Sequence, residues 1–88
     1  MQILVICRPA EGADPAEFRR LVPAETAALR DLKGSSVLTG AWSPGRPGAV
    51  LMLDAPDEAE AARLMAGLPL VQAGLISHDI IPLHPLDL

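Results

Sequence analysis

Glu25 is the ionisable residue whose position in the sequence points most directly to chemistry. It lies within a predicted helix whose apolar residues recur at helical spacing: Phe18, Leu21, Val22, Ala28, Leu29 and Leu32. A carboxyl group on that side faces the core, and burial raises its pKa towards neutrality, as a general acid or base requires. The alternative is a structural carboxylate that pairs with an arginine or caps a backbone group near Pro23, since proline interrupts the hydrogen bonding of the helix.

His78 is the second candidate for proton transfer. Strand alternation places it on the same side as Ile76 and Ile80 and on the side opposite its neighbour Asp79. His78 and Asp79 therefore cannot form a dyad with each other within a regular strand. Two interpretations remain open: a core histidine with one hydrogen bond, or a group that transfers a proton or binds substrate.

Arg8, Trp42 and Arg46 are the candidates for substrate binding. Arg8 ends a predicted strand and can bind a carboxylate with two hydrogen bonds, or it can simply be solvated. Trp42 precedes a turn segment, Ser43–Gly48, where it forms either one wall of a pocket or an interface anchor. Arg46 lies within that turn, which suits a loop facing a ligand and equally suits an ordinary surface turn.

Nucleophilic and metal chemistry find little support. Cys7 has only Arg8 as a basic neighbour, and that side chain points the other way, so we expect a small core residue. His78 and His84 are six residues apart, and no Cys/His cluster has the spacing of a metal site. His84 is expected at an interface or in solvent. The glycines are scattered, so no phosphate-binding loop is predicted.

The chain is predicted to alternate strands and helices in the order β-α-β-β-α-β. The strands are expected at Gln2–Arg8, Val37–Trp42, Ala49–Leu53 and Leu75–Leu83. One helix is expected from Asp14-Pro15 to about Leu32, where Glu17 completes a capping box and Gly34 ends the helix. An Ala-rich helix is expected after Asp57 and ends at Gly67. A short helical turn is possible from Pro69 to Ala73. This order predicts one ferredoxin-like α+β domain over residues 1–88, with a four-stranded antiparallel sheet and both helices on one face.

The predicted sheet carries apolar residues on both of its faces. The runs Ile3–Cys7 and Ala49–Leu53 do not alternate with polar residues, although antiparallel sheets with one wet face usually do. Helices cover one face, and a second copy of the chain is expected to cover the other. The alternative is a monomer with a partly exposed sheet, which is unusual because large exposed apolar patches are rare in monomers.

Composition bounds the partners and the compartment. The net charge is −4, so nucleic acid is not an expected partner, and no apolar run is long enough to span a membrane. A single cysteine allows no internal disulfide, and the first residues carry no basic region of a signal peptide. The expectation is a cytoplasmic protein.

Several local motifs resemble the dimeric α+β barrel superfamily, and within it muconolactone isomerase and its relatives. The similar features are Glu25 nine residues before Gly34, Trp42 with Arg46, Leu68-Pro69-Leu70, and Asp79–Leu83. The chain also resembles, more distantly, the YCII-like group, through Pro23-Ala24-Glu25 and Val71–Leu75. The His-Asp pair proposed as the active site of that group is replaced here by Glu25 and Leu68.

The resemblance implies an enzyme of the isomerase or lyase type, without a cofactor, acting on a small organic acid, lactone or oxidised aromatic metabolite. Glu25 and His78 would be catalytic, and Trp42, Arg46 and Arg8 would bind the substrate. A cyclisation step in natural-product synthesis is a related possibility. Two other readings stay open: a cofactor-free or haem-linked monooxygenase, and a non-catalytic domain for small-molecule binding or assembly.

Overall fold

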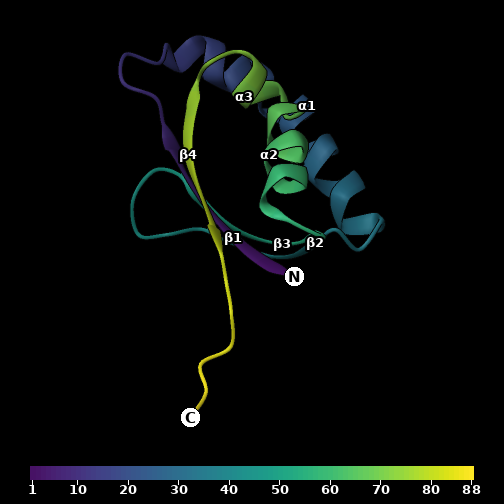
Figure 1. The fold of residues 1–88 in the computed structure, drawn as a ribbon. Coiled ribbons are helices and arrows are strands. Elements are labelled where there is room, and N and C mark those ends of the chain that lie inside the picture. Colours follow the sequence, from purple (N-terminus) through teal and green to yellow (C-terminus); the bar gives the residue numbers. More distant parts are fainter.

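The structure, a computed structural model, describes all 88 residues and contains four strands and three helices. In chain order the elements are β1 (Gln2–Pro9), α1 (Pro15–Gly34), β2 (Leu38–Trp42), β3 (Ala49–Asp54), α2 (Glu58–Ala66), α3 (Pro69–Gln72) and β4 (Ile76–Pro82). The predicted order is confirmed, and the short helical turn before the last strand is α3. The helices lie together on one side of the sheet (Figure 1).

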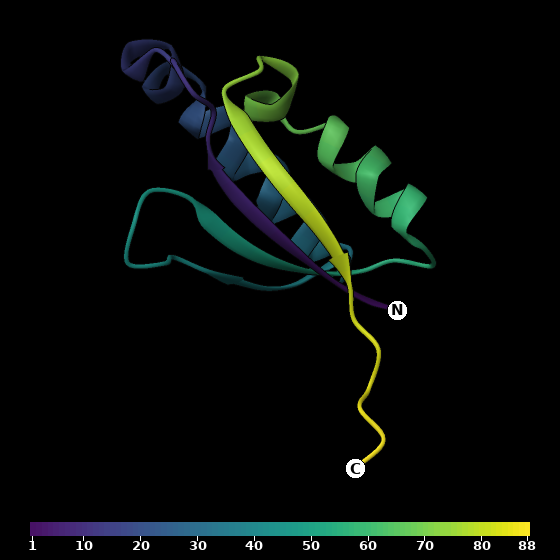
Figure 2. The same cartoon turned by 60° about the vertical axis from the view of Figure 1, so that its left-hand side comes forward.

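The sheet is antiparallel, with the strand order β2-β3-β1-β4. β1 lies in the centre, where Val5 is paired with Leu51 of β3 and Ile80 of β4. Residues directly opposite one another share a face of the sheet, so this register divides the side chains into two sets. The two views agree that one face meets the helices and the other meets no part of the chain (Figure 2).

The core lies between the helices and one face of the sheet. Ile3, Val5 and Cys7 of β1 point to this side, and their cross-strand partners Leu51 and Leu53 are equally buried. The burial of Cys7 confirms the prediction of a small core residue. Ala61 and Met65 of α2 and Leu68 in the link to α3 are also buried in this core, and Ala28, Leu29 and Leu32 of α1 pack against it.

α1 begins at a cap that differs from the predicted capping box. The Asp14 carboxylate accepts a hydrogen bond from the Ala16 backbone N–H, at 3.0 Å. Glu17 does not return a bond to the cap, because its carboxylate pairs with Arg20 one turn further along. Only the Asp14 half of the box forms, so the reciprocal contact was a wrong prediction.

The other end and the buried side of α1 also depart from the sequence pattern. The helix includes Gly34, and the residue with a left-handed backbone is Ser36, at φ 64°. Val22 is 40% exposed, so the apolar stripe is narrower than its spacing predicts. Glu25, in contrast, is only 8% exposed and is the one buried polar residue of the protein. Its predicted burial is therefore confirmed.

The second face of the sheet is apolar and uncovered within this chain. The register assigns to it Leu4, Ile6, Trp42, Val50, Met52 and Ile81. Trp42 is 56% exposed, and its indole lies over Gly40, where an added Cβ would come within 2.5 Å of the ring. We call this set the open face. The open face confirms that the sheet carries apolar residues on both sides, and no segment of this chain packs on it.

The chain leaves the sheet after β4 as an extended tail. The Leu83 N–H donates to the Gln2 carbonyl at 2.9 Å, and the residues beyond point away from the body (Figures 1 and 2). Leu86 and Leu88 are almost fully exposed. None of the helices has the length and apolar character that crossing a membrane requires.

Gly48 fixes how the β2–β3 loop meets the end of β1, and its replacement is a test of this packing. Its φ is 134°, and an added Cβ would lie 2.2 Å from the Cys7 carbonyl oxygen. We expect Gly48→Ala to lower the free energy of unfolding by at least about 2 kcal/mol in urea titrations, because strain and overlap add. Gly45→Ala in the same loop meets nothing and serves as the control. Equal losses in both variants would contradict the predicted contact.

Candidate active site

A cavity of about 620 Å³ opens between the first half of α1 and the end of the sheet where β1 ends and β3 begins. Its wall is mainly apolar and includes Pro9, Phe18, Leu29, Ala49, Leu70 and Ile76. Pro47 and Gly48 bring the β2–β3 loop to its edge. Only two ionisable side chains line it, Glu25 and Arg19. The cavity therefore combines an apolar lining with one carboxyl group and one guanidinium cation.

Glu25 is held at this wall by a backbone donor from α3. Its Oε1 accepts a hydrogen bond from the Leu70 N–H at 3.0 Å. Because Pro69 occupies the first position of α3, this N–H belongs to the first turn and has no partner inside the helix. Oε2 has no hydrogen-bond partner and is not fully enclosed, so it is accessible from the cavity. One oxygen is fixed and the other is free to exchange a proton.

The surroundings of Glu25 favour its neutral form. Burial raises the pKa of the carboxyl group above its ordinary value, and the Leu70 N–H lowers it by a smaller amount. Burial also raises the pKa of the Cys7 thiol to about 11, and the Glu25 charge adds to this increase. The second effect means that Cys7 lies close enough to Glu25 to experience its charge. A carboxyl group with a raised pKa is suited to exchanging protons near neutral pH.

His78 lies on the helix-covered face but outside the cavity lining. It is paired across the sheet with Cys7, so both side chains point towards the helices. Its Nδ1 is enclosed and has no hydrogen-bond partner. The structure thus places His78 beside Cys7 on the helix-covered face and does not bring it to the surface of the cavity.

The three residues predicted to bind substrate do not come together. Arg8 and Trp42 lie on the open face, on the side of the sheet opposite Glu25, and the Arg8 guanidinium pairs with the Asp79 carboxylate at 2.9 Å. Arg46 is in the exposed β2–β3 loop, next to Pro47 at the edge of the cavity. Arg8 and Arg46 each precede a proline of the cavity lining, Pro9 and Pro47, but neither arginine lines the cavity itself.

Comparison with known proteins places the domain in a family. A family model described as the YCII-related domain matches residues 1–83. The chain belongs to the YCII-related domain family. No match was found among curated proteins.

Two solved structures share the fold of this YCII-related domain. Muconolactone isomerase aligns with a TM-score of 0.77 and 20% identity, over 99% of this chain and 94% of that one. The 5-chloro-2-hydroxyhydroquinone dehydrochlorinase TftG of Burkholderia phenoliruptrix AC1100, in complex with 2,5-dihydroxybenzoquinone, aligns with a TM-score of 0.74 and 18% identity, over 96% of this chain and 94% of that one. The family match confirms the resemblance to the YCII-like group, and the two structures confirm the predicted α+β fold.

Leu68 occupies the position of the Asp in the His-Asp pair of the YCII-like group, and a leucine cannot act as an acid. Leu68 is 3% exposed and belongs to the apolar core. Glu25 instead finds its partner two residues later, in the Leu70 backbone. The prediction from sequence missed both Leu70 and Arg19. The available signal for Leu70 was the proline before it, since Pro69 begins a helix and leaves the next N–H free.

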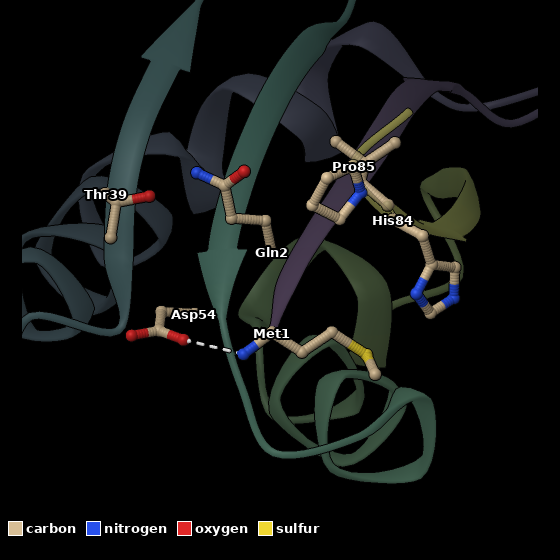
Figure 3. A pocket seen from close by; sticks show the side chains of 7 residues that line it. Met1, Gln2, Thr39, Asp54, His84 and Pro85 are labelled. Carbon is tan, nitrogen blue, oxygen red and sulfur yellow. Dashed lines mark hydrogen bonds and ion pairs between the residues drawn. The ribbon is translucent and has the colours of Figure 1, made fainter. Parts of the chain in front are cut away.

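A second cavity, of about 470 Å³, lies at the other end of β1 beside the C-terminal tail. The Met1 amino group there pairs with Asp54 Oδ1 at 3.2 Å, and the His84 imidazole lies apart from this pair (Figure 3). Gln2 and Thr39 contribute neutral polar groups. The Met1 amino group and the Asp54 carboxylate of this cavity are exposed and neutralise each other.

Neither a metal-binding cluster nor a haem ligand is found at the cavity beside Glu25. No three His, Cys, Asp or Glu residues gather closely enough to hold a metal ion. The cavity at Glu25 is lined by no His, Cys, Met or Tyr, the side chains that usually ligate haem iron. The residues present therefore do not fit a haem group.

The reactivity of the Cys7 thiol tests whether the core beside Glu25 is shielded from solvent. With a pKa of about 11 in place of 9.0, the thiolate fraction at pH 8 falls about 100-fold. We expect native Cys7 to react with iodoacetamide at least about 100-fold more slowly than the unfolded chain, as followed by mass spectrometry. Rapid labelling of the folded protein would contradict the burial of this thiol.

Proposed function

We propose that this YCII-related domain is an enzyme that moves a proton on a small organic acid, lactone or oxidised aromatic metabolite, leading to isomerisation, cyclisation or elimination. The observation that carries the proposal is the Glu25 carboxyl group in an apolar cavity, with Oε1 held by the Leu70 N–H and Oε2 accessible. Glu25 is the proposed general acid and base. The chemistry requires no cofactor.

The proposed step uses the two oxygens of Glu25 differently. The Leu70 N–H orients the carboxyl group, so that Oε2 faces the space where a substrate binds. As a carboxylate, Oε2 accepts a proton from the carbon beside a carbonyl group, and the electron pair of that bond moves into an enolate. Glu25 then returns this proton to a second carbon of the substrate, or the electron pair of the enolate expels a leaving group, which takes the proton from Oε2. Apolar walls keep water from competing for the proton.

The other predicted site residues have supporting roles in this proposal. His78, with its enclosed and unpartnered Nδ1 beside Cys7, is the candidate for a proton path behind Glu25. Arg46 contributes positive charge at the edge of the cavity. Arg8 and Trp42 act on substrate only if a second chain closes the open face on which they lie.

The related folds support the substrate class. A muconolactone isomerase and a dehydrochlorinase bound to 2,5-dihydroxybenzoquinone both have this architecture. We accordingly propose a role in the breakdown of aromatic compounds or in secondary metabolism. A homodimer that buries the open face, located in the cytoplasm, completes the proposal.

The test of the proposed activity follows hydrogen exchange at carbon. Purified protein is incubated in D₂O with a panel of small unsaturated γ-lactones and keto acids, and deuterium at the acidic carbon is measured by NMR. The proposal expects catalysed exchange with at least one member, abolished by Glu25→Gln. Exchange that is equal in the wild type and in this variant would favour the non-catalytic reading, and so would its absence across the panel.

A further inference from the structure

Arg19 is the one cation in the cavity lining, and it has no partner in the protein. It neither donates a side-chain hydrogen bond nor forms an ion pair within the chain. Its neighbour Arg20 shows the contrast, because that guanidinium is engaged by Glu17. A guanidinium free of local carboxylates keeps its donors available for a ligand.

The placement of Arg19 relative to Glu25 gives the cavity two chemically different ends. The two residues are six positions apart on α1, which corresponds to about 9 Å along the helix axis. Arg19 lies nearer the start of the helix, on an exposed stretch, whereas Glu25 is buried under α3. The rest of the lining is mainly apolar and includes Phe18 and Leu29.

The other acidic groups near the start of α1 leave this guanidinium available. The Asp14 carboxylate is occupied by the Ala16 N–H, and the Glu17 carboxylate by Arg20. Neither lines the cavity. The only acid that shares the cavity with Arg19 is Glu25, and its surroundings favour the uncharged form.

From this arrangement we infer that Arg19 binds the carboxylate of the substrate at the mouth of the cavity, so that the ligand is an amphiphilic anion with an apolar body directed towards Glu25. The inference rests on the proposed use of this cavity as the substrate site. It narrows the substrate class, because neutral lactones and quinones lack the group that Arg19 would bind. A planar guanidinium suits a carboxylate, since it presents two parallel N–H donors.

The test compares an anion with its neutral isostere. Binding of 2-naphthoate and 2-naphthamide is measured by ligand-observed NMR at pH 7 in low salt. We expect wild-type protein to prefer the carboxylate, and Arg19→Gln to lower naphthoate affinity about fivefold to tenfold while leaving naphthamide unchanged within about twofold. Arg30→Gln removes the same charge from an exposed position of the same helix that does not line the cavity, and should change neither affinity.

The outcomes separate this inference from the proposed function. Arg19→Gln that retains the preference for naphthoate would overturn the role of Arg19, and a loss of preference in Arg46→Gln alone would assign the anion to the β2–β3 loop instead. Equal affinity of the wild type for both probes would also overturn it. Glu25→Gln should keep the preference for naphthoate even though it removes proton exchange, so failure of one proposal leaves the other testable.

Discussion

Glu25→Gln is expected to lower catalysed proton exchange by about 10²-fold to 10⁴-fold, which is the usual contribution of a positioned acid or base. The amide can still accept the Leu70 N–H through its carbonyl oxygen, so the contact at 3.0 Å has a replacement. It cannot take up a proton at the second position. The measurement is the rate of deuterium incorporation at carbon, followed by NMR at saturating substrate.

The rate of proton exchange by the wild type should also depend on pH in a direction that the raised pKa of Glu25 determines. As a base, Glu25 must be ionised, and its pKa is raised by burial, so the rate should fall as the pH decreases through that raised pKa. An exposed glutamate would instead keep its activity to lower pH. Glu58→Gln, which removes an exposed carboxylate on α2, should leave both the rate and the profile unchanged.

Stability measurements show whether the variant loses chemistry or structure. A raised pKa means that the folded state holds its proton more tightly, so wild-type stability is fully present below the ordinary pKa and declines as pH rises through the raised value. Glu25→Gln lacks this decline and should be relatively more stable at neutral pH. A variant that is folded, stable and fully active would remove Glu25 from the mechanism.

The burial of Glu25 could be predicted from sequence, whereas its partner could not. The periodicity of α1 places position 25 on the buried side whatever the rest of the chain does. The Leu70 N–H is 45 residues away and reaches Glu25 only because α3 packs over α1, a contact that local patterns do not encode. The position of Arg19 could not be predicted for the same reason. The periodicity of α1 places it on the exposed side, and it lines a cavity only because distant residues such as Pro47 and Ile76 lie nearby.

The face of the sheet that packs against the helices could not be predicted from the sequence. Alternation correctly separated Arg8 from Cys7 and His78 from Asp79. It could not say which set meets the helices, because apolar residues occur on both faces and the usual contrast between wet and dry sides is missing. The family resemblance groups Trp42 and Arg8 with Glu25, whereas the structure places them on the opposite face.

Ile6→Glu is expected to convert the proposed homodimer into a monomer, with the dissociation constant increased by at least about 100-fold. Ile6 lies on the central strand of the open face, among Leu4, Val50 and Met52. A carboxylate at this position would be buried twice in a symmetric dimer, once from each chain, and each unpaired charge costs several kcal/mol. In a monomer the same residue is exposed to water and costs little.

Sedimentation velocity from about 1 to 100 µM measures the effect, with circular dichroism to show that the sheet is intact. Val22→Glu provides the matched control, since it introduces the same charge at a partly exposed apolar residue of α1, away from the open face. Should Ile6→Glu fail to fold, Trp42→Arg tests the same surface at an edge strand, where the side chain is already 56% exposed. A wild-type protein that is monomeric at 100 µM would contradict the dimer outright.

The proposed homodimer and the cavity can be tested separately, because they use opposite faces of the sheet. The residues that line the cavity at Glu25 lie on the helix-covered side of the sheet, whereas Ile6 points to the open face. A folded monomeric variant should therefore keep its affinity for 2-naphthoate, because Arg19 and the apolar walls are untouched. If binding is lost together with the dimer, the second chain must complete the site, and Arg8 and Trp42 on the open face would then be the residues through which it does so.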